Sequence, residues 1–181
     1  MNKIWVVLLS AMVAAPVFAA DDGFYAGLGI GDGKLGVNTI TGLSKSSDLV
    51  VGGIVGYQIN RNFAAEMQYT GIGKATDTVG NTVKGDAFSL TAVGTLPLNE
   101  SFDLYGKLGV ADSKTTTSAG FAGTGTSRTA LTYGIGAQYN VNARAGVRLG
   151  WDRYGAATAD ATGTKTNFNA DVFGVSAIIK F

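Results

Sequence analysis

The sequence predicts an all-β protein, an eight-stranded antiparallel up-and-down transmembrane β-barrel. Three observations predict it. Apolar and polar residues alternate with a period of two in eight segments, short and long connections alternate between those segments, and the apolar face of every segment lacks charged residues. Successive strand side chains point to opposite faces, and in a membrane barrel one face contacts lipid while the other lines a polar lumen. The pattern therefore indicates a barrel in a bilayer.

The N-terminus has the pattern of a secretory signal peptide. Lys3 precedes an apolar run over residues 4–13, and small residues follow before Asp21 and Asp22. The run is far shorter than the roughly 20 residues of a membrane helix. We expect residues 1–19 to be the signal peptide, or alternatively 1–20, and residues 20–181 to form a single outer-membrane β-barrel domain.

The first four segments are each defined by apolar residues two positions apart. They are 24–30 with Phe24 and Leu28, 49–59 with Leu49 and Val55, 63–69 with Phe63 and Met67, and 88–96 with Phe88 and Leu90. The second segment departs from the pattern, because Val50 and Ile54 fall on the lumen side.

The last four segments follow the same rule. They are 102–110 with Phe102 and Leu104, 131–139 with Leu131 and Ile135, 143–151 with Val147 and Leu149, and 173–181 with Phe173 and Phe181. No later apolar run is long enough for a membrane helix, so a chain that spans a membrane must do so with strands.

The connections place the two ends of the barrel. Tight ones at 60–62, 97–101 and 140–142 contain Asn or Pro, which favour turns. Long ones at 31–48, 70–87, 111–130 and 152–172 are rich in Gly, Thr, Ser and Ala. Short periplasmic turns and long extracellular loops are typical of bacterial outer-membrane barrels.

Outward aromatic residues gather near both segment ends, as at the two interfaces of a membrane. The short-turn group is Phe24, Tyr57, Phe63, Phe102, Tyr139 and Phe181, and the long-loop group is Tyr69, Phe88, Tyr133, Trp151 and Phe173. A water-soluble lipocalin-like barrel is the structural alternative. It would need a charged outer surface, whereas the non-apolar face here is dominated by glycine.

Composition excludes several kinds of chemistry. The chain has no Cys and no His, which removes disulfides, Cys/His and Ser/His nucleophiles and the commonest zinc ligands. A formal net charge of +1 argues against nucleic acid as a partner. We therefore expect no enzymatic activity, no cofactor and no metal site.

Three charged residues lie in mid-segment on the lumen face: Glu66, Lys107 and Arg148. Charges at membrane depth are costly unless they are paired or hydrated. We expect Glu66 to pair with Arg148, with Lys107 nearby. The cluster either holds the wall together or forms a gate, and the narrow interior of eight strands favours the structural role.

A glycine-rich stretch and several carboxylates are better explained by structure than by ligand binding. Gly29, Gly31, Gly33 and Lys34 resemble a phosphate-binding loop, but no helix follows, so tight wall curvature explains the glycines better. Further carboxylates are expected in or at the margins of the long loops as solvated residues: Asp77, Asp86, Asp112, Asp152, Asp160 and Asp171.

Several stretches together resemble the transmembrane domain of the outer membrane protein A family. They are Phe24-Tyr25-Ala26-Gly27, Gly56-Tyr57-Gln58-Ile59-Asn60, Glu66-Met67-Gln68-Tyr69, Leu90-Thr91-Ala92, Leu104-Tyr105-Gly106-Lys107-Leu108-Gly109 and Ala145-Gly146-Val147-Arg148-Leu149. The resemblance implies a Gram-negative outer-membrane barrel, inserted by the barrel assembly machinery through a C-terminal aromatic, here Phe181.

The resemblance also implies that lumen salt bridges exchange partners to gate a small channel. Glu66 and Arg148 match two family positions, but Val93 stands in place of a lysine and Gln138 in place of a second glutamate. We therefore expect no second pair with which to exchange. Peptidoglycan anchoring is not carried over to this chain.

These observations predict a cell outer-membrane protein with a structural or surface-interaction, adhesin-like role carried by its long loops. The alternative is a narrow porin-like channel for small solutes or ions. The expected partners are outer-membrane lipid and lipopolysaccharide, the barrel assembly machinery and an unknown extracellular ligand.

Overall fold

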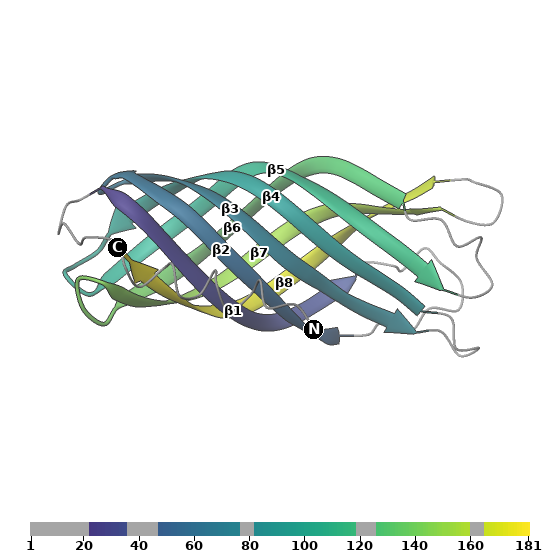
Figure 1. Ribbon diagram of the computed structural model, residues 1–181, viewed down its shortest axis with the longest axis horizontal. Coiled ribbons are helices and arrows are strands. Elements are labelled where there is room, and N and C mark those ends of the chain that lie inside the picture. The colour runs from purple at the N-terminus through teal and green to yellow at the C-terminus, as the bar shows by residue number, and fades with distance from the viewer. Residues whose placement is uncertain (1–21, 36–46, 77–81, 119–125, 160–164) are drawn as a thin grey trace, which may run out of the picture.

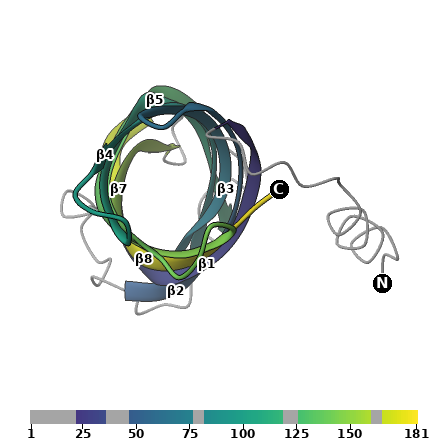
Figure 2. The same cartoon turned by 90° about the vertical axis from the view of Figure 1, so that its left-hand side faces the viewer.

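The computed structural model describes residues 22–35, 47–76, 82–118, 126–159 and 165–181. They form eight antiparallel strands that close into one barrel in chain order, as Figures 1 and 2 show. The strands are β1 (Gly23–Leu35), β2 (Ser47–Asn60), β3 (Phe63–Thr76), β4 (Thr82–Pro97), β5 (Phe102–Ser118), β6 (Thr126–Asn140), β7 (Ala145–Ala159) and β8 (Lys165–Lys180). The predicted fold class is confirmed. The described residues include no helix long and apolar enough to cross a membrane.

The alternation of faces is as predicted. Leu90, Leu104 and Ile135 are 53%, 44% and 64% exposed on the outside of the barrel. On the inside, Glu66 is buried, and so are Val50 and Ile54 of the irregular second segment. A lipocalin-like arrangement, with apolar residues inside and charges outside, is thereby excluded.

Both predicted groups of aromatic residues lie on the outer face. At the short-turn end the rings of Phe24 and Tyr57 contact each other, as do those of Phe102 and Tyr139. At the other end Tyr133 meets Trp151 edge to face. Their assignment to the two membrane interfaces stays a prediction.

The three short turns share one mechanism. In each, an Asn side-chain oxygen accepts hydrogen bonds from the backbone N–H groups two and three residues later, as Asx turns do. The three Asn residues are Asn60, Asn99 and Asn142. The last of these turns includes Ala143 and Arg144, so β7 begins at Ala145 and the predicted start at 143 is wrong.

The strands run farther than predicted at the long-loop end, so the connections there are shorter than expected. Strand β5, for example, continues to Ser118, not Val110. Beyond the outer aromatic group the wall carries charged residues in the outward positions, such as Asp112 and Lys114. The apolar signal therefore ends while backbone pairing continues, since the ladder needs no apolar side chains.

Two pairs of neighbouring strands are hydrogen-bonded over only part of their length. Among the described residues, pairing of β2 with β3 ends at Gly52 and Thr70, and pairing of β6 with β7 ends at Tyr133 and Arg153. The other ladders continue toward the outer end. The outer part of the wall thus consists of two four-stranded halves, β3–β6 and β7–β8–β1–β2.

Candidate functional site: the lumen lock

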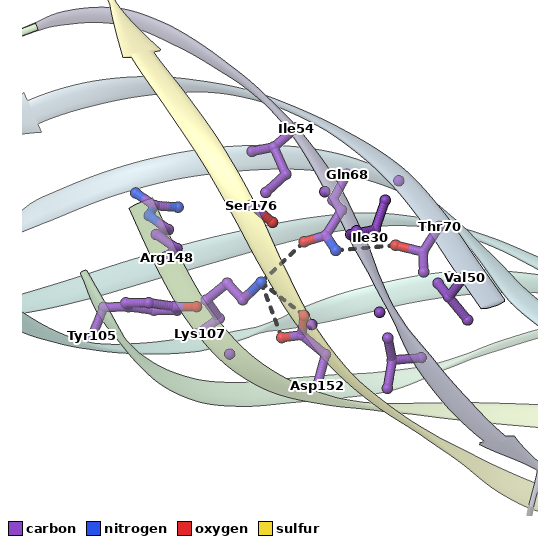
Figure 3. Close-up of a pocket in the computed structure, with 16 residues that line it drawn as sticks. Ile30, Val50, Ile54, Gln68, Thr70, Tyr105, Lys107, Arg148, Asp152 and Ser176 are labelled. Atoms are coloured by element: carbon purple, nitrogen blue, oxygen red, sulfur yellow. Dashed lines mark hydrogen bonds and ion pairs between the residues drawn. The ribbon is translucent and has the colours of Figure 1, made fainter. Parts of the chain in front are cut away.

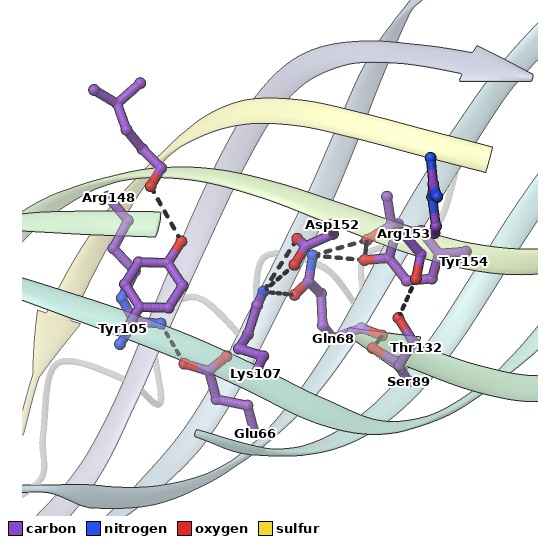
Figure 4. Close-up of polar contacts among 12 residues, drawn as sticks. Glu66, Gln68, Ser89, Tyr105, Lys107, Thr132, Arg148, Asp152, Arg153 and Tyr154 are labelled. Carbon is purple, nitrogen blue, oxygen red and sulfur yellow. Dashed lines mark hydrogen bonds and ion pairs between the residues drawn. The ribbon is translucent and has the colours of Figure 1, made fainter. Parts of the chain in front are cut away.

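Glu66 and Arg148 meet in the lumen, as predicted. They come from β3 and β7, and Nη1 of Arg148 forms an ion pair with Oε1 of Glu66 (Figure 4). The same carboxylate oxygen accepts a 2.6 Å hydrogen bond from Oη of Tyr25. The guanidinium lies between two aromatic rings, 5.2 Å from the Tyr25 centroid and 5.0 Å from that of Tyr105. We call Tyr25, Glu66, Tyr105 and Arg148 the inner lock.

Glycines make room for both tyrosines. A Cβ at Gly56 would overlap the ring of Tyr25, and one at Gly136 or Gly150 would overlap the phenol of Tyr105. The barrel wall therefore carries no side chain at the points where the two tyrosine rings lie against it. This explains part of the glycine content of the lumen face in terms of two specific niches.

Apolar side chains complete the block. Tyr25 and Tyr105 belong to a buried cluster with Ile54, Ala64, Val93 and Ile178. Val93, which occupies the position of a lysine in the resembling family, is 1% exposed and fills space in this plug. The lumen is thus closed by packed side chains as well as by an ion pair.

Lys107 does not join the inner lock. Its Nζ lies 2.9 Å from Oδ1 of Asp152 and 2.9 Å from Oε1 of Gln68. Nε2 of Gln68 in turn donates to Thr70 and Tyr154 at 3.0 and 3.2 Å. We call Gln68, Lys107 and Asp152 the outer network (Figures 3 and 4).

The outer network corrects two expectations. Asp152 was predicted as a loop acid, and no second ion pair was expected beside the inner lock. Asp152 instead lies on β7, four residues after Arg148, and points inward. Continuing the parity of Arg148 along the strand would have found it.

Two cavities adjoin the inner lock. One of about 40 Å³ lies toward the outer network and is lined by Gln68, Lys107, Arg148, Asp152 and Ser176 among others (Figure 3). The other, of about 450 Å³, opens at the short-turn end, and Tyr25 and Arg148 also line it. We call the second one the vestibule. Arg148 therefore separates the vestibule from the space above it.

Besides Oγ of Ser113, two buried side-chain oxygens of the described residues have no hydrogen-bond partner: Oε2 of Glu66 and Oγ1 of Thr91. The two residues lie opposite each other in the β3–β4 register. An unpaired buried carboxylate oxygen is costly. The carboxylate of the inner lock is thus satisfied on one side only.

Other predicted acids lie on the outer wall of the strands. Asp171 forms a two-bond ion pair with Arg153, at 2.7 and 2.9 Å. The hydrogen bond from Arg153 to Asp171 raises the pKa of the guanidinium above its usual value. Asp86 accepts from Tyr69 and Asp112 from Thr129, so these acids lie on strands and not in loops.

Some sequence-based expectations fall outside the described residues, namely the signal peptide, Asp77 and Asp160. Within the described ranges no group of three or more Asp or Glu is placed to hold a metal ion. Gly29, Gly31 and Gly33 lie inside β1, which is inconsistent with a phosphate-binding loop. The backbone N–H of Phe181 donates to Phe24, and its role as an assembly signal stays a prediction.

A closed eight-stranded wall with an apolar outside and an ion pair across its lumen agrees with the sequence comparison. The outer membrane protein beta-barrel domain family matches residues 5–181. The chain belongs to this family. It is a small outer-membrane β-barrel that crosses the membrane with its strands. Members of the family are generally non-enzymatic, and no curated protein matches the sequence significantly.

Solved structures with the same fold come from several bacteria. The Neisserial surface protein A is 15% identical with a TM-score of 0.67, covering 88% of this chain and 97% of that one. The N-terminal barrel of Pseudomonas aeruginosa OprF is 15% identical with a TM-score of 0.57, covering 87% and 99%. Ail, the attachment invasion locus protein of Yersinia pestis, is 18% identical with a TM-score of 0.54, covering 88% and 99%.

Proposed function

We propose that this protein is an outer-membrane barrel with a closed lumen that acts through its outer surface, in a structural or surface-interaction, adhesin-like role. The observation that carries the proposal is the inner lock. Arg148 lies about 5 Å from the ring centroids of Tyr25 and Tyr105, is paired with Glu66, and adjoins a cluster of buried apolar side chains. A lumen blocked in this way leaves the outer surface as the part of the barrel that meets other molecules.

The extended strands support this role. Strands β4 and β5 continue past the outer aromatic group, and outward positions there are polar, including Lys84, Asp86 and Lys114. A polar outer surface of this kind is suited to water and not to lipid. The fold shared with Ail and with Neisserial surface protein A, which are by name an attachment protein and a surface protein, is consistent with such a role.

The orientation is tested first. Because the chain has no Cys, single substitutions Lys84→Cys and Lys114→Cys give specific labelling sites, with Arg61→Cys and Arg144→Cys at the short turns as matched controls. An impermeant maleimide should label the first two on intact cells. The controls should react only after the outer membrane is permeabilised. The reverse pattern would contradict the proposal.

The role itself is tested by binding. Cells that express the protein are compared with cells that express a variant whose long connections are replaced by short Gly-Asn turns, on immobilised host cells and matrix proteins. The variant should reach the membrane, which its migration with and without boiling shows, and should lose adhesion. Equal adhesion of the two strains would rule out the surface-interaction role.

A narrow channel is the second candidate, and one observation favours it. Arg148 lines both the vestibule and the smaller cavity, so it lies where the two spaces are closest to each other. Planar-bilayer recording of Arg148→Ala and Glu66→Ala tests this. Conductance that rises in both variants supports a gated channel, whereas no current in any form removes it.

A further inference from the structure

The inner lock is connected to the vestibule at the short-turn end by a chain of hydrogen-bonded side chains. Nε of Arg148 donates to Oε1 of Gln138 at 2.6 Å. Nε2 of Gln138 donates to Oδ1 of Asn140 at 2.6 Å, and Nδ2 of Asn140 donates to Oδ2 of Asp103 at 2.7 Å. Three consecutive hydrogen bonds thus join a buried cation to a carboxylate at the vestibule.

The direction of this chain is fixed by its two ends. A guanidinium can only donate and a carboxylate can only accept, so Gln138 must present its oxygen to Arg148 and its NH₂ group to Asn140. Asn140 must then present its oxygen to Gln138 and its NH₂ group to Asp103. Every bond points from the cation to the anion, and bonds aligned in this way polarise and strengthen one another.

The strand register holds the chain in place. Asp103 lies opposite Gln138 on β5 and β6, and Gln138 lies opposite Arg148 on β6 and β7. All four members also line the vestibule. Other cations line it too, such as Arg144 and Lys180, but among the described residues none forms an ion pair with Asp103.

We propose that Asp103, Asn140 and Gln138 are positioning residues that hold Arg148 in the lock from the short-turn end. The lock is then set by the vestibule: a cation or hydrogen-bond donor that engages Asp103 there draws it away from Asn140 and weakens the hold on Arg148. Gln138 is suited to this task because it accepts and donates at once. A glutamate at this position would have no donor for Asn140.

The test reads the hydrogen bond of Arg148 directly. The protein is reconstituted in nanodiscs, and hydrogen exchange of the Arg148 Nε–H is followed by NMR in the native protein and in Asp103→Ala, Asp103→Asn and Asn140→Ala. Glu100→Gln is the matched control, because Glu100 also lines the vestibule but lies outside the chain. Each variant is folded if it migrates more slowly on a gel after heating than before.

We expect Asp103→Ala and Asn140→Ala to accelerate this exchange about tenfold, because the amide chain that orients the Gln138 oxygen toward Arg148 then lacks a hydrogen bond of typical strength. Asp103→Asn keeps an acceptor and should give a smaller increase, and Glu100→Gln should stay within about twofold. Unchanged exchange in Asp103→Ala would overturn the proposal. An equal increase in Glu100→Gln would also overturn it, because the effect would then come from general vestibule charge.

A double-mutant cycle gives an independent reading. In Gln138→Leu the chain is already cut and only the bond from Asn140 to Asp103 is left to lose, so adding Asp103→Ala should lower the urea unfolding midpoint less than Asp103→Ala does alone. Additive effects of the two substitutions would indicate that Asp103 and Arg148 are not linked through Gln138.

Discussion

The inner lock and the outer network each contain an ion pair inside the lumen, but the surroundings of the two ion pairs differ. The side chains of Arg148 and Glu66 are 7% and 0% exposed, and two tyrosines and apolar residues enclose them. The side chain of Asp152 is 14% exposed, and the 40 Å³ cavity adjoins it and Lys107. Glu66 lines neither this cavity nor the vestibule, whereas Asp152 borders a cavity large enough for a water molecule, so the outer carboxylate has an alternative partner that the inner carboxylate lacks.

This difference in surroundings indicates which of the two ion pairs closes the barrel. A buried pair is strongly sensitive to loss of one partner, because the remaining charge is left in a medium of low dielectric constant. Where water can replace the missing partner, the loss is smaller. The inner lock should therefore dominate both stability and closure, and the outer network should act as a weaker support.

Removal of Arg148 should have the largest effect. In Arg148→Ala, Glu66 keeps only its hydrogen bond from Tyr25, so the free energy of unfolding should fall by about 3–5 kcal/mol. Urea titration in lipid vesicles, followed by gel migration without boiling, measures this. Arg144→Ala, in the short turn, is the control and should change little. Equal effects of the two would contradict the importance of burial.

Filling a glycine niche should have the next largest effect. Gly56→Ala places a methyl group where the Tyr25 ring lies, and the forced shift should cost about 1–3 kcal/mol. Gly94→Ala is the matched control, because no atom lies within 4 Å of its added Cβ. The same titration compares them. If both variants match the native protein, Tyr25 is not held by this niche.

Neutralising Asp152 should have a smaller effect than either. Asp152→Asn still offers an oxygen to Lys107, and water in the cavity can share the charge, so the expected loss is about 1–2 kcal/mol. A loss as large as that of Arg148→Ala would remove the distinction between the two clusters.

The ion pair on the outer face of the barrel, Arg153 with Asp171, should contribute least to stability. Arg153 and Asp171 are each about one-third exposed, and exposed ion pairs contribute little to stability, a contribution that salt reduces further. Arg153→Ala should therefore shift the unfolding midpoint slightly at low salt and not at all at high salt. A large, salt-independent shift would show that Arg153 stabilises the wall by packing on Trp151.

Much of this arrangement could be predicted from the pattern of residues. The parity of each segment gives the outward face, from Leu90 to Ile135, because lipid accepts only apolar side chains along a strand. The pairing of Glu66 with Arg148 follows from their shared face and opposite charge. Strand ends beyond the apolar band could not be found in this way, since pairing there involves backbone groups common to all sequences.

The sequence alone thus determined a membrane barrel, its inside and outside, and the presence of charges in its lumen. Three features are seen only in the folded barrel: Lys107 pairs with Asp152, two tyrosines lie beside Arg148, and Asp103 is linked to Arg148 through the side-chain amides of Asn140 and Gln138. The physical reason is that parity defines one strand at a time. Partners across a lumen depend on the register and stagger of all eight strands, which only the closed barrel fixes.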